Sequence, residues 1–327
     1  MSSSSSASGQ GKQHGFFYIA LATFLFSSME IALKTVAGQF NALQLNFLRF
    51  LIGGLFLLPF ALRSLRKRHS AIRPRDMGFF ALSGLTCVVA SMTLYQLAIQ
   101  SCRASIVAIL FSCNPVVVIP LAAIFLKERI RGFTIATMIL SVAGMVCIMN
   151  PFDMSASPAG IFLTLGSAVV FAAYAVMGKT KSVAFGGLAT TAFSFIIGSG
   201  ELFVLILASR IQAVAGMLRT AGFGNFADIP LFAGLDLRVL PVFAYISLCV
   251  TGTGYAAYFM AIEESSSATA SLVFYIKPAM APILAFLVLG ESIAASTFAG
   301  IVLVTLGSAI SFAGSRRVKH PNRELRT

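Results

Sequence analysis

Two matching stretches decide the fold, LFSCNPVVVIPLAAIFLKERI at 110–130 and VFYIKPAMAPILAFLVLGESI at 273–293. At a fixed offset of 163 residues, both stretches carry proline and glutamate at the same places, and the register continues outward without gaps. Chance supplies Leu and Ala matches easily, but it rarely supplies Pro, Glu, Tyr and Gly matches together. The matched pairs include Pro115 with Pro278, Glu128 with Glu291, Tyr95 with Tyr258 and Gly144 with Gly307.

The composition of the chain excludes a soluble globule. The 327 residues are 57% hydrophobic and 11% charged, with a mean hydropathy of +0.89. A soluble domain averages about 25% charged residues, so this chain has too little polar surface to cover itself in water. We therefore expect a polytopic membrane protein.

Ten apolar segments are each long enough to cross a bilayer as a helix, which takes about 20 residues. They are 15–37, 44–62, 77–99, 104–126, 132–150, 159–178, 188–208, 239–260, 267–289 and 294–313. Several links between them are very short, so neighbouring helices run antiparallel. The one long connection, 209–238, is of mixed polarity, and we expect it to be irregular or partly amphipathic.

The basic residues orient the chain in the membrane. With a cytoplasmic N-terminus, 17 Lys and Arg fall on the cytoplasmic side and five on the other side. This bias predicts a multi-pass protein of the cell (inner) membrane with both termini cytoplasmic. Because the basic residues gather in the 63–75 loop and in the tail, the net charge of +13 reflects topology, and we do not expect nucleic-acid binding.

The repeat divides the chain into two units of five helices. Since five is odd, the second unit enters the membrane from the opposite side, which is the inverted repeat that transporters use for alternating access. The predicted fold class is thus an all-α polytopic membrane protein with ten transmembrane helices as two inverted repeats. We expect a disordered tail at 1–14, the first repeat at 15–150, the second at 151–313 and a basic cytoplasmic tail at 314–327.

Three motifs resemble those of a known family. They are NPVVVIPLAAIFLKERI, KPAMAPILAFLVLGESI and LNFLRFLIGGLFLLP (45–59), and the resemblance covers nearly the whole chain. The sequence is similar to EamA-type members of the drug/metabolite transporter superfamily. The resemblance implies secondary transport, and many bacterial members are similar to exporters of amino acids and related metabolites. Family members often have a neutral or acidic residue before the ninth-span proline, whereas this chain has Lys277.

Charged residues inside the predicted spans are the first candidates for a site. Each one costs at least about 2.5–3.5 kcal/mol on insertion scales, so each needs a reason. Glu30 and Lys34 lie four residues apart and share a helix face, so a local pair is one interpretation. The other is that Glu30 faces a central cavity, where it binds a substrate ammonium or couples protons. Glu201, after two glycines, is a second candidate for proton coupling or a partner for Arg49.

Lys277 precedes a proline, which frees a helix carbonyl, and a cation there could hold a substrate carboxylate or serve as the counter-ion of Glu30. Both roles fit a pair that closes when empty and opens around a zwitterion. Asn114 occupies the equivalent place in the first half and is a candidate neutral partner. Arg49 either binds an anion or locks a helix. Tyr95 and Tyr258 suit a cavity wall or the membrane interface.

These residues predict a secondary active transporter, of the exporter type by resemblance, for a small polar or zwitterionic metabolite such as an amino acid. The alternatives are a lipid or lipid-linked-sugar flippase and, less favoured, an intramembrane enzyme, for which the spans hold no His or Asp. We expect no cofactor and no metal site, membrane lipids and a small molecule as partners, a proton as a candidate coupling ion, and a monomer or weak homodimer. GTGYAA at 252–257 fits a dinucleotide motif, but it lies within a span, where glycines permit close helix contact.

Overall fold

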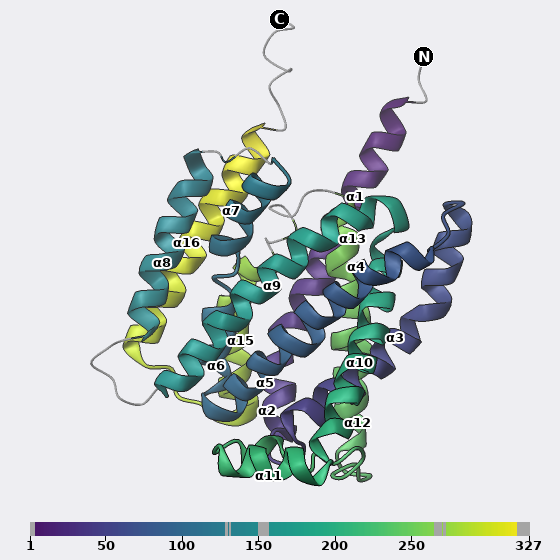
Figure 1. The fold of residues 1–327 in the computed structure, drawn as a ribbon. Helices are drawn as coiled ribbons and strands as arrows, with labels where there is room; N and C mark the ends of the chain where they lie inside the picture. The colour runs from purple at the N-terminus through teal and green to yellow at the C-terminus, as the bar shows by residue number, and fades with distance from the viewer. Residues whose placement is uncertain are drawn as a thin grey trace, which may run out of the picture.

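The computed structural model describes residues 4–127, 130, 132–149, 157–264, 270 and 273–318, and every regular element in these ranges is a helix (Figure 1). Two elements, η1 and η3, are π-helices and η2 is a 3₁₀-helix. The order is α1 (Ser4–Ser27), α2 (Met29–Val36), α3 (Ala42–Lys67), α4 (Pro74–Gly84), η1 (Leu85–Ser91), α5 (Met92–Ser101), α6 (Ala104–Phe111), α7 (Pro115–Phe125), α8 (Gly132–Met149), α9 (Pro158–Phe185), α10 (Gly187–Ser209), α11 (Gln212–Thr220), η2 (Gly224–Phe226), α12 (Leu240–Ala244), η3 (Tyr245–Gly254), α13 (Tyr255–Glu264), α15 (Val273–Leu289) and α16 (Ala295–Val318).

Within the described residues, seven helical segments are long and apolar enough to cross a membrane, and three shorter apolar helices accompany them. The seven are Phe17–Val36, Ala42–Lys67, Pro74–Ser101, Ala104–Phe125, Pro158–Phe185, Gly187–Ser209 and Leu240–Glu264, and the three are Gly132–Gly144, Met280–Leu289 and Ala295–Gly307. Large apolar side chains face outward, among them Phe125 at 72% exposure and Leu287 at 70%, as expected against lipid. The all-α membrane class is confirmed, whereas the count of ten spans and the inverted repeat stay predictions.

The structure describes the two terminal segments of the chain only in part. The helix α1 begins at Ser4, so it continues into residues 1–14, for which the sequence predicts a disordered tail; that disorder stays a prediction. Glu128 and residues 319–327 of the predicted basic tail lie outside the described residues. The start of α1 and the end of α16 lie at the same end of the bundle (Figure 1).

The first span is broken in its second half. The Ser27 hydroxyl donates to the Thr23 carbonyl at 2.7 Å, and the Ser28 hydroxyl lies 3.0 Å from the Leu25 carbonyl. Serines that bond back to the preceding turn bend a helix. The hydroxyl groups of Ser28 and Tyr245 also share a hydrogen bond of 2.6 Å, which ties the break to η3. The bend therefore sets the direction of α2 and of Glu30.

Three other spans are irregular. The π-helices η1 and η3 interrupt the spans Pro74–Ser101 and Leu240–Glu264, and such π turns often accompany functional sites. The span Ala104–Phe125 breaks between α6 and α7, where Pro115 has no N–H to continue the helix. At the break between α6 and α7, the amides of Cys113 and Asn114 donate to the Leu110 and Phe111 carbonyls at 3.1 and 3.0 Å, so the backbone stays hydrogen-bonded.

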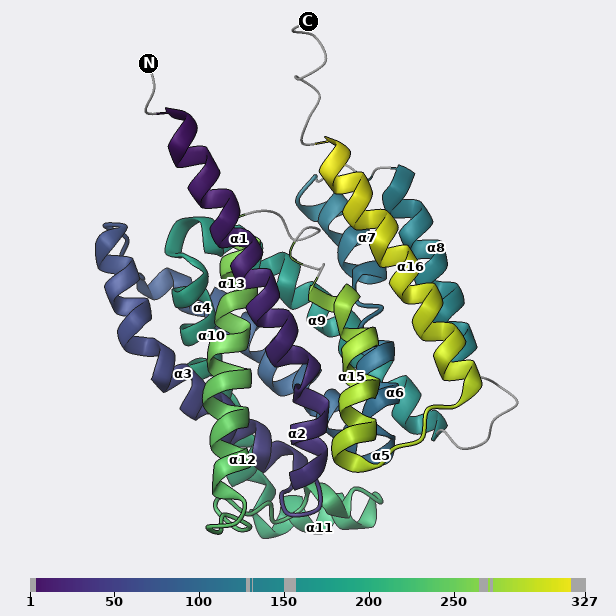
Figure 2. The same cartoon turned by 180° about the vertical axis from the view of Figure 1, so that it is seen from behind.

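The helices from the two halves of the chain pack against each other rather than forming two separate bundles. The contacting pairs are α8 with α16, α3 with α10, α5 with α9, α1 with α13 and α6 with α15. Figures 1 and 2 show α8 and α16 along one flank and α3 and α10 along the other. Glycines allow the close contacts: a Cβ on Gly144 would lie 2.8 Å from the Gly300 carbonyl, and one on Gly307 3.1 Å from the Thr137 carbonyl.

The long connection 210–239 covers the end of the bundle away from the start of α1 (Figure 1). It contains α11 and η2. Two side chains at the start of α3 hold it: Asn41 donates to the Asn225 carbonyl at 2.7 Å, and Gln44 donates to the Ala233 carbonyl at 2.6 Å. These bonds close that end over the residues described next.

Candidate functional site

A buried ion pair joins the two halves of the chain at the centre of the bundle. Glu30 on α2 pairs through Oε1 with the Lys277 ammonium on α15, and the Tyr95 hydroxyl on α5 donates to the same carboxylate oxygen. All three side chains are fully buried. The Lys277 nitrogen also lies 5.2 Å from the ring centroid of Phe111 and 5.9 Å from that of Tyr95, so aromatic faces complete its surroundings.

Lys34 does not take part in this pair. Its ammonium donates to the Ile99 carbonyl at 2.6 Å and to the Cys102 carbonyl at 2.7 Å, where α5 ends. The last carbonyls of a helix lack partners within the helix and attract a cation. Of the two partners that the sequence leaves open for Glu30, the structure selects Lys277.

Arg49 is fully buried on α3 and has few partners. Its Nε donates to the Asn46 side-chain oxygen at 3.0 Å, and its guanidinium lies 4.6 Å from the centroid of the Phe50 ring. Its Nη1 and Nη2 have no hydrogen-bond partner among the described residues. Within the described chain, Arg49 therefore carries a buried charge that only one hydrogen bond and one ring contact accompany.

The other candidates from the sequence lie in three different places. Asn114 sits at the break between α6 and α7 and donates to the Ala168 carbonyl of α9 at 2.7 Å. Tyr258 is buried among aromatic side chains, and its hydroxyl has no partner among the described residues. Glu201 is half-buried on α10, apart from the pair, in a run whose apolar neighbours are largely exposed. The structure thus gathers Glu30, Lys277 and Tyr95 but not Glu201.

A run of ring contacts connects the surroundings of Arg49 with those of the ion pair. Ring centroids lie 5.8 Å apart for Phe50 and Tyr255, 4.9 Å for Tyr255 and Phe26, and 6.3 Å for Phe26 and Phe274. Phe274 lies 5.8 Å from Phe111, which contacts Lys277. The ring beside Arg49 and the ring beside Lys277 therefore belong to one aromatic cluster.

Sequence reasoning missed two members of this site. Tyr255, whose hydroxyl lies 2.9 Å from the Met92 sulfur, belongs to the GTGYAA motif that was interpreted through its glycines alone. Gln96 is fully buried, and neither its oxygen nor its nitrogen has a partner among the described residues. The available signal was a polar residue next to Tyr95 within an apolar span.

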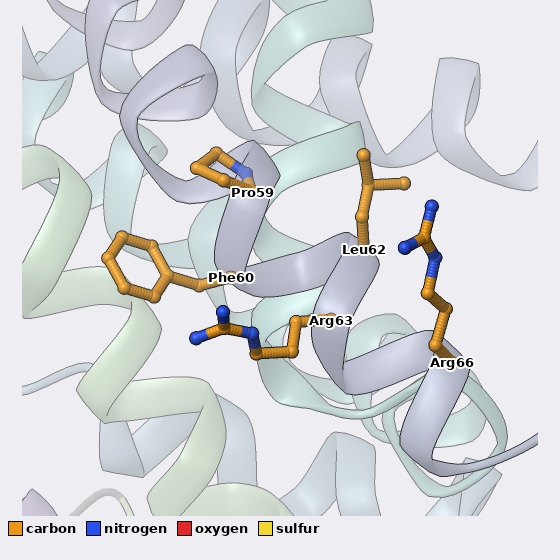
Figure 3. Close-up of a pocket in the computed structure, with 5 residues that line it drawn as sticks. All are labelled: Pro59, Phe60, Leu62, Arg63 and Arg66. Atoms are coloured by element: carbon orange, nitrogen blue, oxygen red, sulfur yellow. The ribbon is translucent and has the colours of Figure 1, made fainter.

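A different kind of hollow lies on the surface near the end of α3. It has a volume of about 350 Å³ and is lined by Pro59, Phe60, Leu62, Arg63 and Arg66. Figure 3 shows Phe60 and Arg63 extending to one side of the helix, and Leu62 and Arg66 to the other. Exposed arginines above apolar side chains are typical of a helix end at the level of lipid headgroups. This hollow is distinct from the buried site.

The buried pair places one anion and one cation side by side. A buried ion pair gains little net energy, because the cost of removing both charges from water nearly equals their attraction. The pair therefore adds little to the stability of the fold.

Comparison with known proteins identifies the family. The model of the EamA-like transporter family matches twice, over residues 13–150 and 158–313. An uncharacterized transporter of Clostridium kluyveri is 35% identical over 311 residues, which cover 93% of this chain and 94% of that protein. A probable terminal-alkyne amino-acid exporter of Streptantibioticus cattleyicolor is 24% identical over 311 residues, covering 92% and 96%. A chain of known crystal structure, 15% identical, superposes with a TM-score of 0.66 over 95% of this chain and 99% of its own length, which supports the fold. The chain belongs to the EamA-like transporter family.

Proposed function

We propose that the chain is a secondary active transporter that exports a small polar or zwitterionic metabolite, such as an amino acid, by alternating access. The observation that carries the proposal is the buried pair of Glu30 and Lys277 with the Tyr95 hydroxyl, inside a bundle of membrane-spanning helices. A charged pair that only stabilised the fold could be replaced by apolar residues at little cost, so its presence indicates a use.

The family consists of transporters, so the alternative of an intramembrane enzyme is excluded.

Alternating access needs two similar halves, and three observations support that organisation. The family model matches each half separately. The helix pairs α5 with α9 and α1 with α13 are equivalent under exchange of the halves. The π-helix at 85–91 falls, at the repeat offset of 163 residues, within the π-helix at 245–254.

The transport cycle follows from the charges of the pair. In the empty site, Glu30 and Lys277 neutralise each other and hold α2 and α15 together. An arriving zwitterion separates them, with its ammonium at Glu30 and its carboxylate at Lys277. Two halves freed from each other in this way can then exchange conformations. Glu30 is also the first candidate for proton coupling, and Glu201 is the second.

The direction and setting of transport rest on likeness and on charge placement. The Streptantibioticus cattleyicolor relative is named as an exporter of an amino acid, which supports export of a related class of molecule. The placement of Lys and Arg supports both termini in the cytoplasm and a location in the cell (inner) membrane. A monomer or a weak homodimer stays our expectation for the assembly.

A lipid flippase is the second candidate. The surface hollow beside Arg63 and Arg66 favours it, because two cations above an apolar wall suit an anionic headgroup (Figure 3). The central site argues against it, because the ion pair is enclosed among aromatic side chains. Scrambling of a fluorescent anionic lipid in vesicles, unchanged by Glu30→Gln, would support the flippase over the metabolite exporter.

Counterflow in proteoliposomes tests the main proposal. Purified full-length protein is reconstituted, and uptake of labelled amino acids is measured with and without a pH gradient. We expect uptake that responds to the gradient and is lost in Glu30→Gln. Arg210→Gln serves as a matched control, because Arg210 donates to the Ile229 carbonyl outside the site. Uptake indifferent to both the gradient and Glu30→Gln would contradict the proposed mechanism.

A further inference from the structure

The described residues carry an uncompensated positive charge in their interior. Four charged side chains are buried: Glu30, Arg49, Asp76 and Lys277. Glu30 pairs with Lys277, and Asp76 pairs with Lys181 at 3.0 Å near the start of α4. No carboxylate in the described part of the chain pairs with Arg49. The ion pair and Arg49 together therefore amount to two buried cations and one buried anion.

The contacts of Arg49 do not neutralise its charge. A guanidinium offers five N–H donors, and Arg49 uses one of them, on Asn46. The Phe50 ring face adds a cation–π contact, which is worth about 0.5–2 kcal/mol. A residue kept only to lock the helix would be expected to donate through Nη1 and Nη2 to backbone carbonyls, as Lys34 does through its ammonium. The two free nitrogens form the planar fork that binds a carboxylate through two hydrogen bonds.

Arg49 also lies at the same depth as the ion pair. Glu30 is six residues before the end of its span at Val36, and Arg49 is seven residues after the start of its span at Ala42. At 1.5 Å per residue, both lie roughly 10 Å from the same end of the bundle. Gln96, which follows Tyr95 in the sequence, is another buried polar side chain without a partner among the described residues.

We propose that Arg49 binds a second carboxylate of the substrate, and that the substrate carries two carboxylates and one ammonium. This inference rests on the proposed function and narrows its substrate class to acidic amino acids and molecules of the same charge pattern. The ammonium meets Glu30, one carboxylate meets Lys277 and the other meets Arg49. A net charge of −1 on the substrate then cancels the net charge of +1 in the site.

The aromatic cluster supplies the rest of the selectivity. Ring contacts run from Phe50 beside Arg49, through Tyr255 and Phe26, toward the rings beside Lys277. A substrate that reaches both charges must move these rings from their present positions and then pack along them. The part of the substrate that joins its two carboxylates is therefore apolar. A compact dianion that lacks the ammonium leaves Glu30 without a cation and binds less well.

The test compares two molecules of nearly the same shape that differ by one negative charge, L-glutamate and L-glutamine. Binding is measured as ligand-induced thermal stabilisation of the full chain in detergent, and transport as counterflow in proteoliposomes. The wild-type protein is expected to prefer glutamate by at least about tenfold, which corresponds to 1.4 kcal/mol. Arg49→Gln is expected to abolish the preference for glutamate over glutamine, and Arg49→Lys to retain part of it.

A second readout separates binding from folding. Arg49→Gln removes a buried charge that has no counter-ion, so the ligand-free variant is expected to melt no lower than wild type. A lower melting temperature together with an intact glutamate preference would overturn the inference and assign Arg49 a structural role. Equal binding of glutamate and glutamine by the wild type would overturn it as well, while the proposed function survives. If the protein binds and carries neither these nor any other labelled amino acid, the proposed function itself fails.

Discussion

The ion pair between Glu30 and Lys277 makes the sharpest prediction about stability. Replacing Lys277 by Met leaves a buried carboxylate, and replacing Glu30 by Gln leaves a buried ammonium. Breaking a buried pair costs about 3–5 kcal/mol. The charge that remains in each variant keeps some of its contacts. In Lys277→Met, Glu30 keeps the Tyr95 hydroxyl, and in Glu30→Gln, Lys277 keeps the ring faces of Phe111 and Tyr95. We therefore expect the lower end of the range, about 3 kcal/mol, for each single variant.

The double variant is the decisive comparison. With both charges removed, neither position holds an unpaired buried ion, and we expect Glu30→Gln with Lys277→Met to lie within about 1 kcal/mol of the wild type. At roughly 2 °C per kcal/mol for a chain of this size, each single variant melts about 6 °C lower and the double variant about 2 °C lower. The double variant is thus more stable than either single variant.

The cysteines supply the assay. The chain has no Trp, but Cys87, Cys102 and Cys113 are free and buried. A thiol-reactive dye added during a temperature ramp in detergent reports their exposure on unfolding. Cys249 is exposed and Cys147 partly exposed in the folded chain, so the series is made in a background with Cys147→Ala and Cys249→Ala. A double variant whose loss of stability equals the sum of the two single losses would refute the pairing.

The pH dependence of the single variants adds a check with opposite signs. In Lys277→Met the carboxyl group left behind can take up a proton, which is easier in acid, so its loss of stability shrinks as the pH falls. In Glu30→Gln the ammonium left behind can release a proton, so its loss shrinks as the pH rises. Each slope is limited to about 1.4 kcal/mol per pH unit, because one proton is exchanged. Equal slopes in both variants would contradict this reasoning.

Three further substitutions and one control test other parts of the bundle. Tyr95→Phe removes a hydrogen bond to the charged Glu30 and should cost about 1.5–3 kcal/mol in the same dye assay, with a loss of counterflow. Glu291→Ala removes the carboxylate that accepts 2.8 and 3.1 Å bonds from the first two amides of α6, and should cost about 0.5–2 kcal/mol and speed labelling of Cys102. Gly84→Ala puts a Cβ 2.6 Å from the Gly198 nitrogen, so it should lower the melting temperature and cost about 1–3 kcal/mol of stability. Gly200→Ala is the control: a Cβ there meets nothing within 4 Å, so this change should be neutral or stabilising.

Several elements of the fold could be predicted from the sequence because they depend on composition and length. Apolar runs of about 20 residues predict spans whatever they pack against. The broken fourth span follows from Pro115, which cannot donate to the preceding turn. The π-helices had no such signal, since their extra residue per turn depends on how neighbouring helices fit together.

The candidate site was predictable in its members but not in its contacts. A charge in an apolar span is conspicuous, so Glu30, Arg49 and Lys277 could be named from the sequence. The i, i+4 spacing of Glu30 and Lys34 also indicated a local pair, yet Lys34 reaches the end of α5 instead. A long flexible side chain near a helix end can choose among several acceptors, and sequence spacing does not fix the choice.

The sequence by itself determined the membrane class and the residues that place charge inside the apolar spans, whereas the ten spans and the repeat that it indicates stay predictions. Tertiary structure alone decided that Glu30 pairs with Lys277 and that Arg49 has no carboxylate partner in the described chain. The physical reason is that lipid and the bundle interior are both apolar. A membrane helix is therefore apolar on every side, and its sequence pattern does not reveal which side faces inward. Glycine contacts and the break at Ser28 set how the helices are rotated about their own axes. Both take effect only once the helices have packed against each other.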